Sequence, residues 1–181
     1  MTDTLYDQNG ILIQGYVKIY DPSNNDIFVD KHNAIHYENM SYALAESLSN
    51  AGQGWVHEIN FGNGGTSIDP TGIITYLTPN NTGVNASLYN QTYTKIIDDR
   101  SISNNDPVRN KTEVRHTSGT NYTDVIVSCL LDYGEPSGQD AFDTATDTES
   151  LYVFDELGLR SWSSTGTGNL LTHVILSLIH I

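Results

Sequence analysis

A glycine-rich segment in the middle of the chain is the first candidate for binding chemistry. Backbone amides in such segments can bind phosphate groups. A nucleotide-binding loop also needs a Lys-Ser or Lys-Thr pair and a helix after its glycines, and residues 66–70 provide neither. We therefore predict a structural turn, whose residues take the positive φ angles that glycine and asparagine tolerate. The turn consists of Gly62, Asn63, Gly64 and Gly65.

Histidines are the second candidate, because imidazole nitrogens bind zinc when their spacing lets them converge. His32 and His36 lie four residues apart, and His57 is followed by Glu58. A zinc-protease helix would need a second histidine four residues after His57, where the chain has Phe61. We predict no metal site and interpret these histidines as structural or surface residues.

No nucleophile and no pair of carboxylates stands out as catalytic. Cys129 is the single cysteine, and its apolar, alternating surroundings favour a buried and unreactive thiol. A glycosidase would need two carboxylates across a cleft, and spacing distinguishes no such pair among the many acidic residues. We expect no enzyme activity and no cofactor.

The composition excludes two classes of partner. The 181 residues contain 22 acidic and 8 basic side chains, which gives a formal net charge of -14. Such a charge repels a nucleic-acid backbone. No stretch approaches the roughly 18 apolar residues of a membrane-spanning helix. We expect a protein that binds neither nucleic acid nor membranes.

The elements that would position these residues are mostly strands. Residues 37–49 have apolar side chains at three- and four-residue steps, which predicts the one helix. Apolar and polar residues alternate elsewhere, and an Asp- and Asn-rich turn predicts a first hairpin. The expected strands cover residues 13–20, 27–29, 55–61, 73–77, 89–97, 114–116, 122–131, 151–159 and 170–175.

Four segments carry burial predictions. The strand before the glycine turn should be half buried, with Ile59 and Phe61 towards the core and Asn60 on the other side. The acidic stretch 132–150 has no periodicity and should be a long exposed loop. The helix should bury Tyr37, Met40, Leu44 and Leu48. The segment 122–131 should be a central strand with a core face of Val125, Val127, Cys129 and Leu131.

Together these elements predict a single, mainly β domain over residues 1–175. Most links are too short for the crossovers that parallel strands need, so antiparallel pairing is expected. The predicted architecture is an antiparallel β-sandwich of about eight strands, jelly-roll or immunoglobulin-like, with the helix near residues 37–49 packed against it.

Several segments resemble virion structural proteins of large contractile-tailed (myovirus-like) bacteriophages, most of which lack assigned roles. The resemblance covers most of the chain and implies a part of the neck, collar, tail or fibre apparatus. It also implies assembly with other virion proteins, a homo-oligomer, and a place in the virion after synthesis in the host cytoplasm. The segments are VDKHNAIHYENMSYALAESL, WVHEINFGNGGT, LYNQTYTKIID, FDELGLRS and NLLTHVI.

A receptor- or glycan-binding module of a tail fibre is the alternative function. In that case Tyr133, Tyr152 and Trp162 would stack on sugar rings, while Asp and Asn side chains would bind the hydroxyl groups. Aromatic residues also favour half-buried positions on a sheet, and strand packing is the simpler account of all three.

The last residues of the chain, LSLIHI, match the translation of a laboratory DNA sequence. Leu176–Ile181 corresponds to the in-frame translation of a transposon-end adapter used in preparing sequencing libraries. We therefore expect a gene from an environmental assembly, a native sequence that stops at about Ile175, and a missing C-terminus. An ordinary strand is the alternative, because the same apolar residues suit one.

Overall fold

The structure is a computed structural model that describes residues 10–132, 135–136, 153–166 and 168–180. This part of the chain contains one helix, α1 (Tyr37–Leu48), and ten strands. The strands are β1 (Gly15–Tyr20), β2 (Ile27–Ile35), β3 (Val56–Gly62), β4 (Thr66–Ile68), β5 (Ile74–Tyr76), β6 (Gln91–Ile96), β7 (Lys111–Arg115), β8 (Asp124–Ser128), β9 (Val153–Ser161) and β10 (Leu170–His180).

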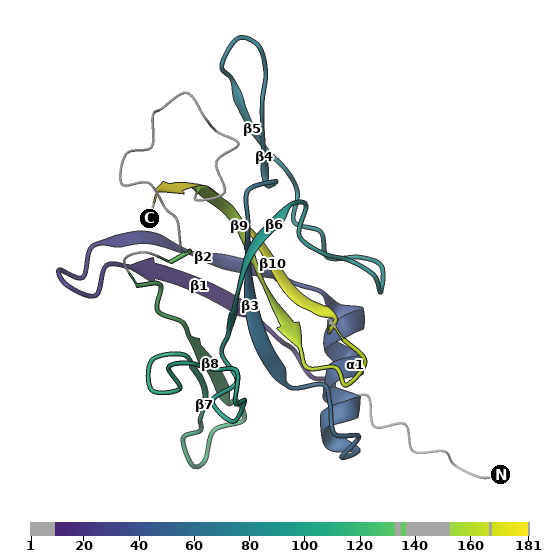
Figure 1. The fold of residues 1–181 in the computed structure, drawn as a ribbon. Helices are drawn as coiled ribbons and strands as arrows, with labels where there is room; N and C mark the ends of the chain where they lie inside the picture. The colour runs from purple at the N-terminus through teal and green to yellow at the C-terminus, as the bar shows by residue number, and fades with distance from the viewer. Residues whose placement is uncertain (1–9, 133–134, 137–152, 167, 181) are drawn as a thin grey trace.

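Six strands form one sheet in the order β1-β2-β10-β9-β3-β6, and every neighbouring pair is antiparallel. The other four form the hairpins β4–β5 and β7–β8. Figure 1 shows both hairpins projecting from the six-stranded sheet. The mainly β, antiparallel, sandwich-like fold predicted from the alternating segments is confirmed.

One face of the six-stranded sheet carries the main apolar core. Its buried side chains come from β2, β3, β9 and β10, and the chain just after β8 packs on them. Removing this apolar surface from water is the main force that holds the layers together. The buried members are Val29, Phe61, Phe154, Leu157, Val174 and Leu176, and Cys129 and Leu131 pack against them.

The opposite face of the sheet is buried as well, and beside a small apolar cluster it carries a set of buried polar side chains. Strand register places Gly62 opposite Glu156, and both Asn60 and His173 opposite Gly158, so these side chains alternate with the apolar ones. Asn60, Glu156 and His173 have no exposed surface. The prediction that Asn60 lies on the open side of a half-buried strand is therefore wrong, because other parts of the chain cover that side.

Helix α1 begins and ends almost where the sequence predicts. His36 is its N-cap, and the ring Nδ1 accepts a hydrogen bond from the Asn39 amide at 3.2 Å. Beyond the helix, Asn50 and Gly52 have φ angles of 56° and 73°, the left-handed conformation that commonly ends a helix.

The face that α1 buries differs from the predicted stripe. Asn39 and Ala43 are its buried residues, whereas Tyr37 and Leu48 are exposed, Leu48 by 83%. The Asn39 side chain donates to the Leu170 carbonyl at 2.9 Å, so a polar contact sets the helix against β10. Ala43, with its small side chain, faces the same way one turn later.

Strand β8 is not the central strand that its alternation predicts. Among the described strands it pairs only with β7, and Val125 is 59% exposed. Cys129 and Leu131, beyond the end of the strand, do pack on the core. Burial raises the pKa of the Cys129 thiol to about 12, which agrees with the predicted unreactive cysteine.

The final strand is longer than predicted. β10 continues to His180, which pairs with Val153 of β9. Leu176 is part of the apolar core. These apolar residues suit a strand whatever their origin, so the pairing is compatible with either interpretation of the LSLIHI segment.

Candidate functional site

The polar face of the sheet is organised around one buried carboxylate. Oε1 of Glu156 accepts hydrogen bonds from the Gly64 and Asn90 amides at 3.1 and 2.7 Å. Oε2 accepts from the Tyr89 amide and from His173 Nε2, both at 2.9 Å. Glu156 thus joins three segments that lie far apart in the sequence, and its charge is fully hydrogen-bonded.

The hydrogen bonds of His173 define its protonation. Nδ1 accepts from the Asn80 amide at 2.7 Å, so this nitrogen carries no proton and Nε2–H is the donor to Glu156. Burial raises the pKa of Glu156, but the hydrogen bonds from His173 and from the Asn90 and Tyr89 amides outweigh it and leave the pKa below its ordinary value. A neutral imidazole therefore supports an ionised carboxylate.

The glycine turn is held by the protein's own carboxylates. Asp155 accepts from the Gly65 amide at 2.8 Å and from the Thr66 hydroxyl, next to the Gly64 bond to Glu156. The amides of Gly64 and Gly65 are thus already used by the protein's own carboxylates.

The reason for the glycines differs from the predicted one. None of the three is among the residues with positive φ. A Cβ on Gly64 would lie 2.6 Å from the Asn90 amide nitrogen, and one on Gly65 would lie 2.8 Å from the Asp155 carbonyl. Glycine is needed here because the backbone approaches other backbone closely.

The histidines considered as metal ligands lie in different environments. His32 packs on Tyr16 with 4.2 Å between ring centroids, and His36 caps α1 and donates from Nε2 to the Gly83 carbonyl at 3.0 Å. His57 Nδ1 lies 3.5 Å from Asp98 Oδ2. In the described ranges, no three or more His, Cys, Asp or Glu side chains come close enough to hold a metal ion.

Of the candidate glycan contacts, the structure describes only Trp162. Its ring stacks on Trp55 at 6.1 Å with 17° between the planes, and the His57 ring meets it at 4.6 Å. The Arg100 guanidinium lies over Trp55 at 5.2 Å. These contacts account for Trp162 as part of a half-buried cluster. Tyr133 and Tyr152 lie outside the described residues.

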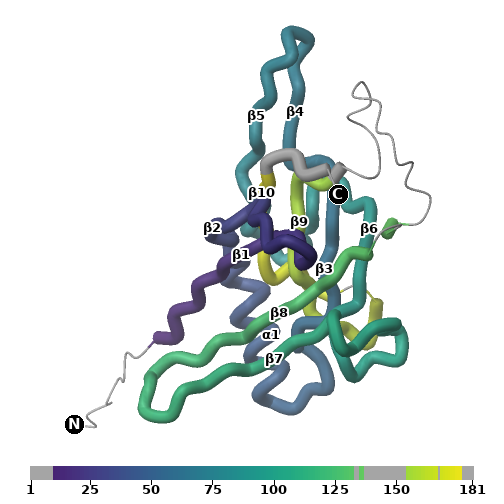
Figure 2. Tube along the Cα trace, turned by 90° about the vertical axis from the view of Figure 1, so that its left-hand side faces the viewer, coloured from purple at the N-terminus to yellow at the C-terminus, as the bar shows by residue number. Residues whose placement is uncertain are grey.

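The largest departure from the predicted architecture is the β4–β5 hairpin. The sequence predicts one short strand here, whereas the structure has two, joined by the turn Asp69–Ile73. Asp69 Oδ1 accepts from the amides of Thr71 and Ile73, and the run Asp-Pro-Thr-Gly is a sequence signal for such a turn. Figures 1 and 2 both show the hairpin standing clear of the six-stranded sheet.

Exposed apolar side chains gather on this and the other hairpins. The β4–β5 hairpin exposes Ile68, Ile73, Ile74 and Tyr76. The β1–β2 hairpin exposes Tyr16, Tyr20, Ile27 and Phe28, and the β7–β8 hairpin with its turn exposes Val114, Tyr122 and Val125. Single exposed apolar residues are common, but sets of them on projecting elements indicate contact surfaces.

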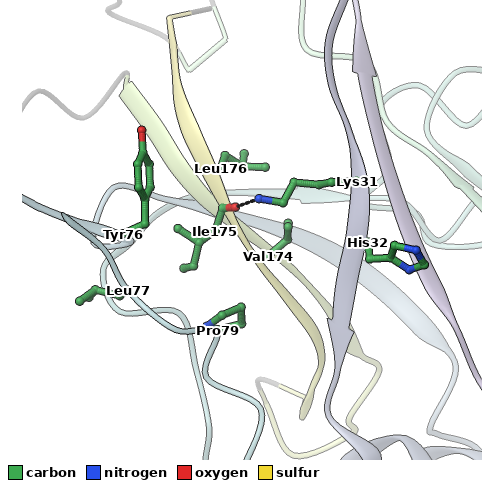
Figure 3. A pocket seen from close by; sticks show the side chains of 8 residues that line it. All are labelled: Lys31, His32, Tyr76, Leu77, Pro79, Val174, Ile175 and Leu176. Carbon is green, nitrogen blue, oxygen red and sulfur yellow. Dashed lines mark hydrogen bonds between the residues drawn. The ribbon is translucent and has the colours of Figure 1, made fainter. Parts of the chain in front are cut away.

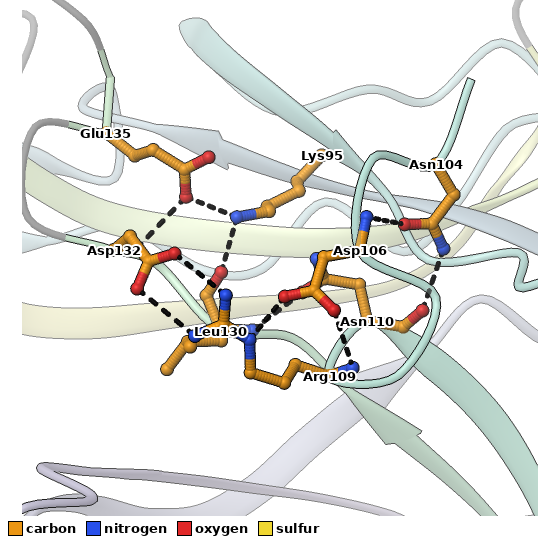
Figure 4. Close-up of polar contacts among 8 residues, drawn as sticks. All are labelled: Lys95, Asn104, Asp106, Arg109, Asn110, Leu130, Asp132 and Glu135. Carbon is orange, nitrogen blue, oxygen red and sulfur yellow. Dashed lines mark hydrogen bonds and ion pairs between the residues drawn. The ribbon is translucent and has the colours of Figure 1, made fainter.

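A polar network fixes the base of the β7–β8 hairpin (Figure 4). Lys95 of β6 bonds to the Leu130 carbonyl and to Glu135, and Arg109 pairs with Asp106 and with Asp132. Asn110 Oδ1 accepts from the Leu130 amide at 2.8 Å. The hairpin therefore leaves the sheet in a defined direction.

A hollow of about 290 Å³ lies at the base of the β4–β5 hairpin. In Figure 3, Tyr76, Leu77 and Pro79 line one side, Val174, Ile175 and Leu176 of β10 lie in the middle, and Lys31 and His32 of β2 lie opposite. Lys31 Nζ donates to the Ile175 carbonyl at 2.6 Å. The hollow thus has a mixed lining, with Leu77 and Pro79 on one side and the polar groups of Lys31 and His32 on the other.

In comparisons with known proteins, the chain matches no family model, no curated protein and no solved structure. Within the described residues, no helix is both long enough and apolar enough to span a membrane.

Proposed function

We propose that this protein is a structural component of a tailed-phage virion, in the neck, collar, tail or fibre region, and that it acts by assembly. The observation that carries the proposal is the set of exposed apolar side chains on the β1–β2 hairpin at the edge of the sheet and on the two hairpins that project from it. Contact with neighbouring proteins would remove this surface from water. This would stabilise the contact by roughly 25 cal/mol for each Å² of apolar surface buried.

Rigid anchoring of the hairpins supports the same function. The glycine turn leads straight into β4, and Asp155 holds Gly65 and Thr66 at that point. On the return side, the Leu77 amide donates to the Gly65 carbonyl at 2.9 Å. An assembly contact benefits from such anchoring because less conformational entropy is lost on binding.

The resemblance of several segments to virion proteins of contractile-tailed phages supports the location. The charge of -14 supports partners other than nucleic acid, because an acidic surface repels a phosphate backbone. Assembly with other virion proteins is a function that agrees with both the resemblance and the charge.

An electron-density map of the intact virion of a phage that encodes this chain tests the proposal. We expect density in the neck, tail or fibre region that fits the six-stranded sheet, α1 and the two projecting hairpins. Proteomics of purified particles provides the opposing result. If infected cells contain the protein and purified particles lack it, the proposal is wrong.

A further inference from the structure

We propose that the β4–β5 hairpin is an exchange arm between two copies of this chain, with the tip of each hairpin seated in the hollow at the base of the other. The inference rests on the assembly function and names one partner for it, a second copy. It concerns the hairpin Thr66–Tyr76 and the hollow described above.

The geometry of the hairpin makes the exchange reciprocal. The hollow is lined by Tyr76 and Leu77, so it lies where the hairpin leaves the body of the protein. Two such hairpins placed side by side about a two-fold axis each bring their tip to the other's base. An interface of this kind is closed, because one pair of copies satisfies both sites.

Tip and hollow both carry exposed apolar side chains. Ile73 at the tip is 62% exposed. The hollow offers Tyr76, which is 51% exposed, and the half-buried side chains of Leu77 and Pro79. Transfer of Ile73 into this space would remove an apolar side chain from water.

Charge also favours the hairpin as the point of contact between copies. Two copies with a net charge of -14 each repel one another. Asp69 is the only charged residue from Thr66 to Tyr76, so the hairpin adds little to this repulsion. Asp69 lies at the tip and Lys31 at the rim of the hollow, so the exchange pairs opposite charges.

Sedimentation of the purified full-length chain tests the partner. We expect a dimer, and we expect Ile73→Ser to weaken it at least tenfold. Ile102→Ser is the matched control, because Ile102 is fully exposed on a different loop and should leave dimerisation unchanged. A protein that stays monomeric at high micromolar concentration overturns the proposal, as does a dimer that Ile73→Ser leaves intact.

The charge pair has its own test. Asp69→Asn removes the charge and keeps the oxygen that accepts from Thr71 and Ile73, so the turn should still form. At low salt we expect Asp69→Asn and Lys31→Met each to weaken the dimer several-fold, and the double variant to be no weaker than either alone. Fully additive effects would show that the two residues do not meet.

Cross-linking between two cysteine variants tests where the tip of the hairpin binds. Chains with Ile73→Cys are mixed with chains with Lys31→Cys and treated with a short bis-maleimide. We expect mixed dimers, and few from an Ile73→Cys and Ile102→Cys mixture. The raised pKa of Cys129 keeps the native thiol slow to react, and the unsubstituted chain measures the remainder.

These results are independent of the virion map. A dimer with the expected cross-link in a protein that purified particles lack would reject the virion role and keep the exchange. A monomer that the map places in the virion would support the virion role and reject the exchange.

Discussion

His173 donates a hydrogen bond to Glu156 across the β9–β10 pair, with 2.9 Å between Nε2 and Oε2, and neither side chain has any exposed surface. The pair lies against the segment that connects β5 to β6 and beside the glycine turn that precedes β4. A buried charge of this kind is tolerated only when its partners are all present. It is therefore the point at which the fold should be most sensitive to small chemical changes.

Glu156→Gln should lower the free energy of unfolding by about 2–4 kcal/mol. The amide keeps the size of the carboxylate, but its nitrogen would face donors that now bond to Glu156. Urea unfolding measures the change. Glu38→Gln, on the exposed start of α1, is the control and should cost only a few tenths of a kcal/mol. Equal effects of the two substitutions would contradict the role of the buried pair.

Stability should fall in acid in a way that depends on Glu156. Its folded pKa is lowered, so its contribution is complete above the unfolded value of about 4.3 and is lost as pH falls through the folded pKa. Urea midpoints from about pH 7 to about pH 3 should therefore decline more steeply for the unsubstituted chain than for Glu156→Gln. Parallel curves would show that Glu156 does not titrate in this way.

Gly64→Ala should destabilise the protein by about 1–3 kcal/mol, because the added Cβ would meet the Asn90 amide nitrogen. Gly10→Ala is the control, since nothing lies within 4 Å of a Cβ there. Thermal unfolding of both variants gives the comparison. If Gly64→Ala is as stable as the control, the close approach of the two segments is wrong.

His36→Ala should cost about 1–3 kcal/mol, because the helix loses its cap and Gly83 loses a donor. His36→Asn should restore the cap, since asparagine is among the best N-cap residues, but not the bond to Gly83. Hydrogen exchange at the Asn39 amide follows the cap directly. If the Asn39 amide exchanges as fast in His36→Asn as in His36→Ala, capping by this side chain is contradicted.

Trp162→Ala should lower the free energy of unfolding by about 2 kcal/mol, because the ring packs on Trp55 and His57. Tyr122→Ala, at an exposed position, is the control. Both proteins are also screened on a glycan array. Glycan binding that disappears in Trp162→Ala while stability is unchanged would favour the glycan-binding alternative over the packing role.

The sequence by itself determined the local elements. The hairpin at residues 13–29, the helix near 37–49 and most strands lie where alternation or three- and four-residue spacing predicts them, because these periods follow directly from backbone geometry. The antiparallel, mainly β class followed from the same patterns and from the short links. The unreactive Cys129 followed from its apolar neighbours.

Only the tertiary structure decided which strands are central and what covers each face. Alternation separates the two sides of a strand but does not say whether the second side meets water, so the buried Asn60 and the exposed Val125 were both missed. The reason for the glycines in the turn was missed because it also depends on tertiary structure. The turn backbone approaches Asn90 and Asp155, which are distant in sequence. The Glu156–His173 pair and the hollow beside Lys31 likewise exist only because the last two strands lie in the middle of the sheet.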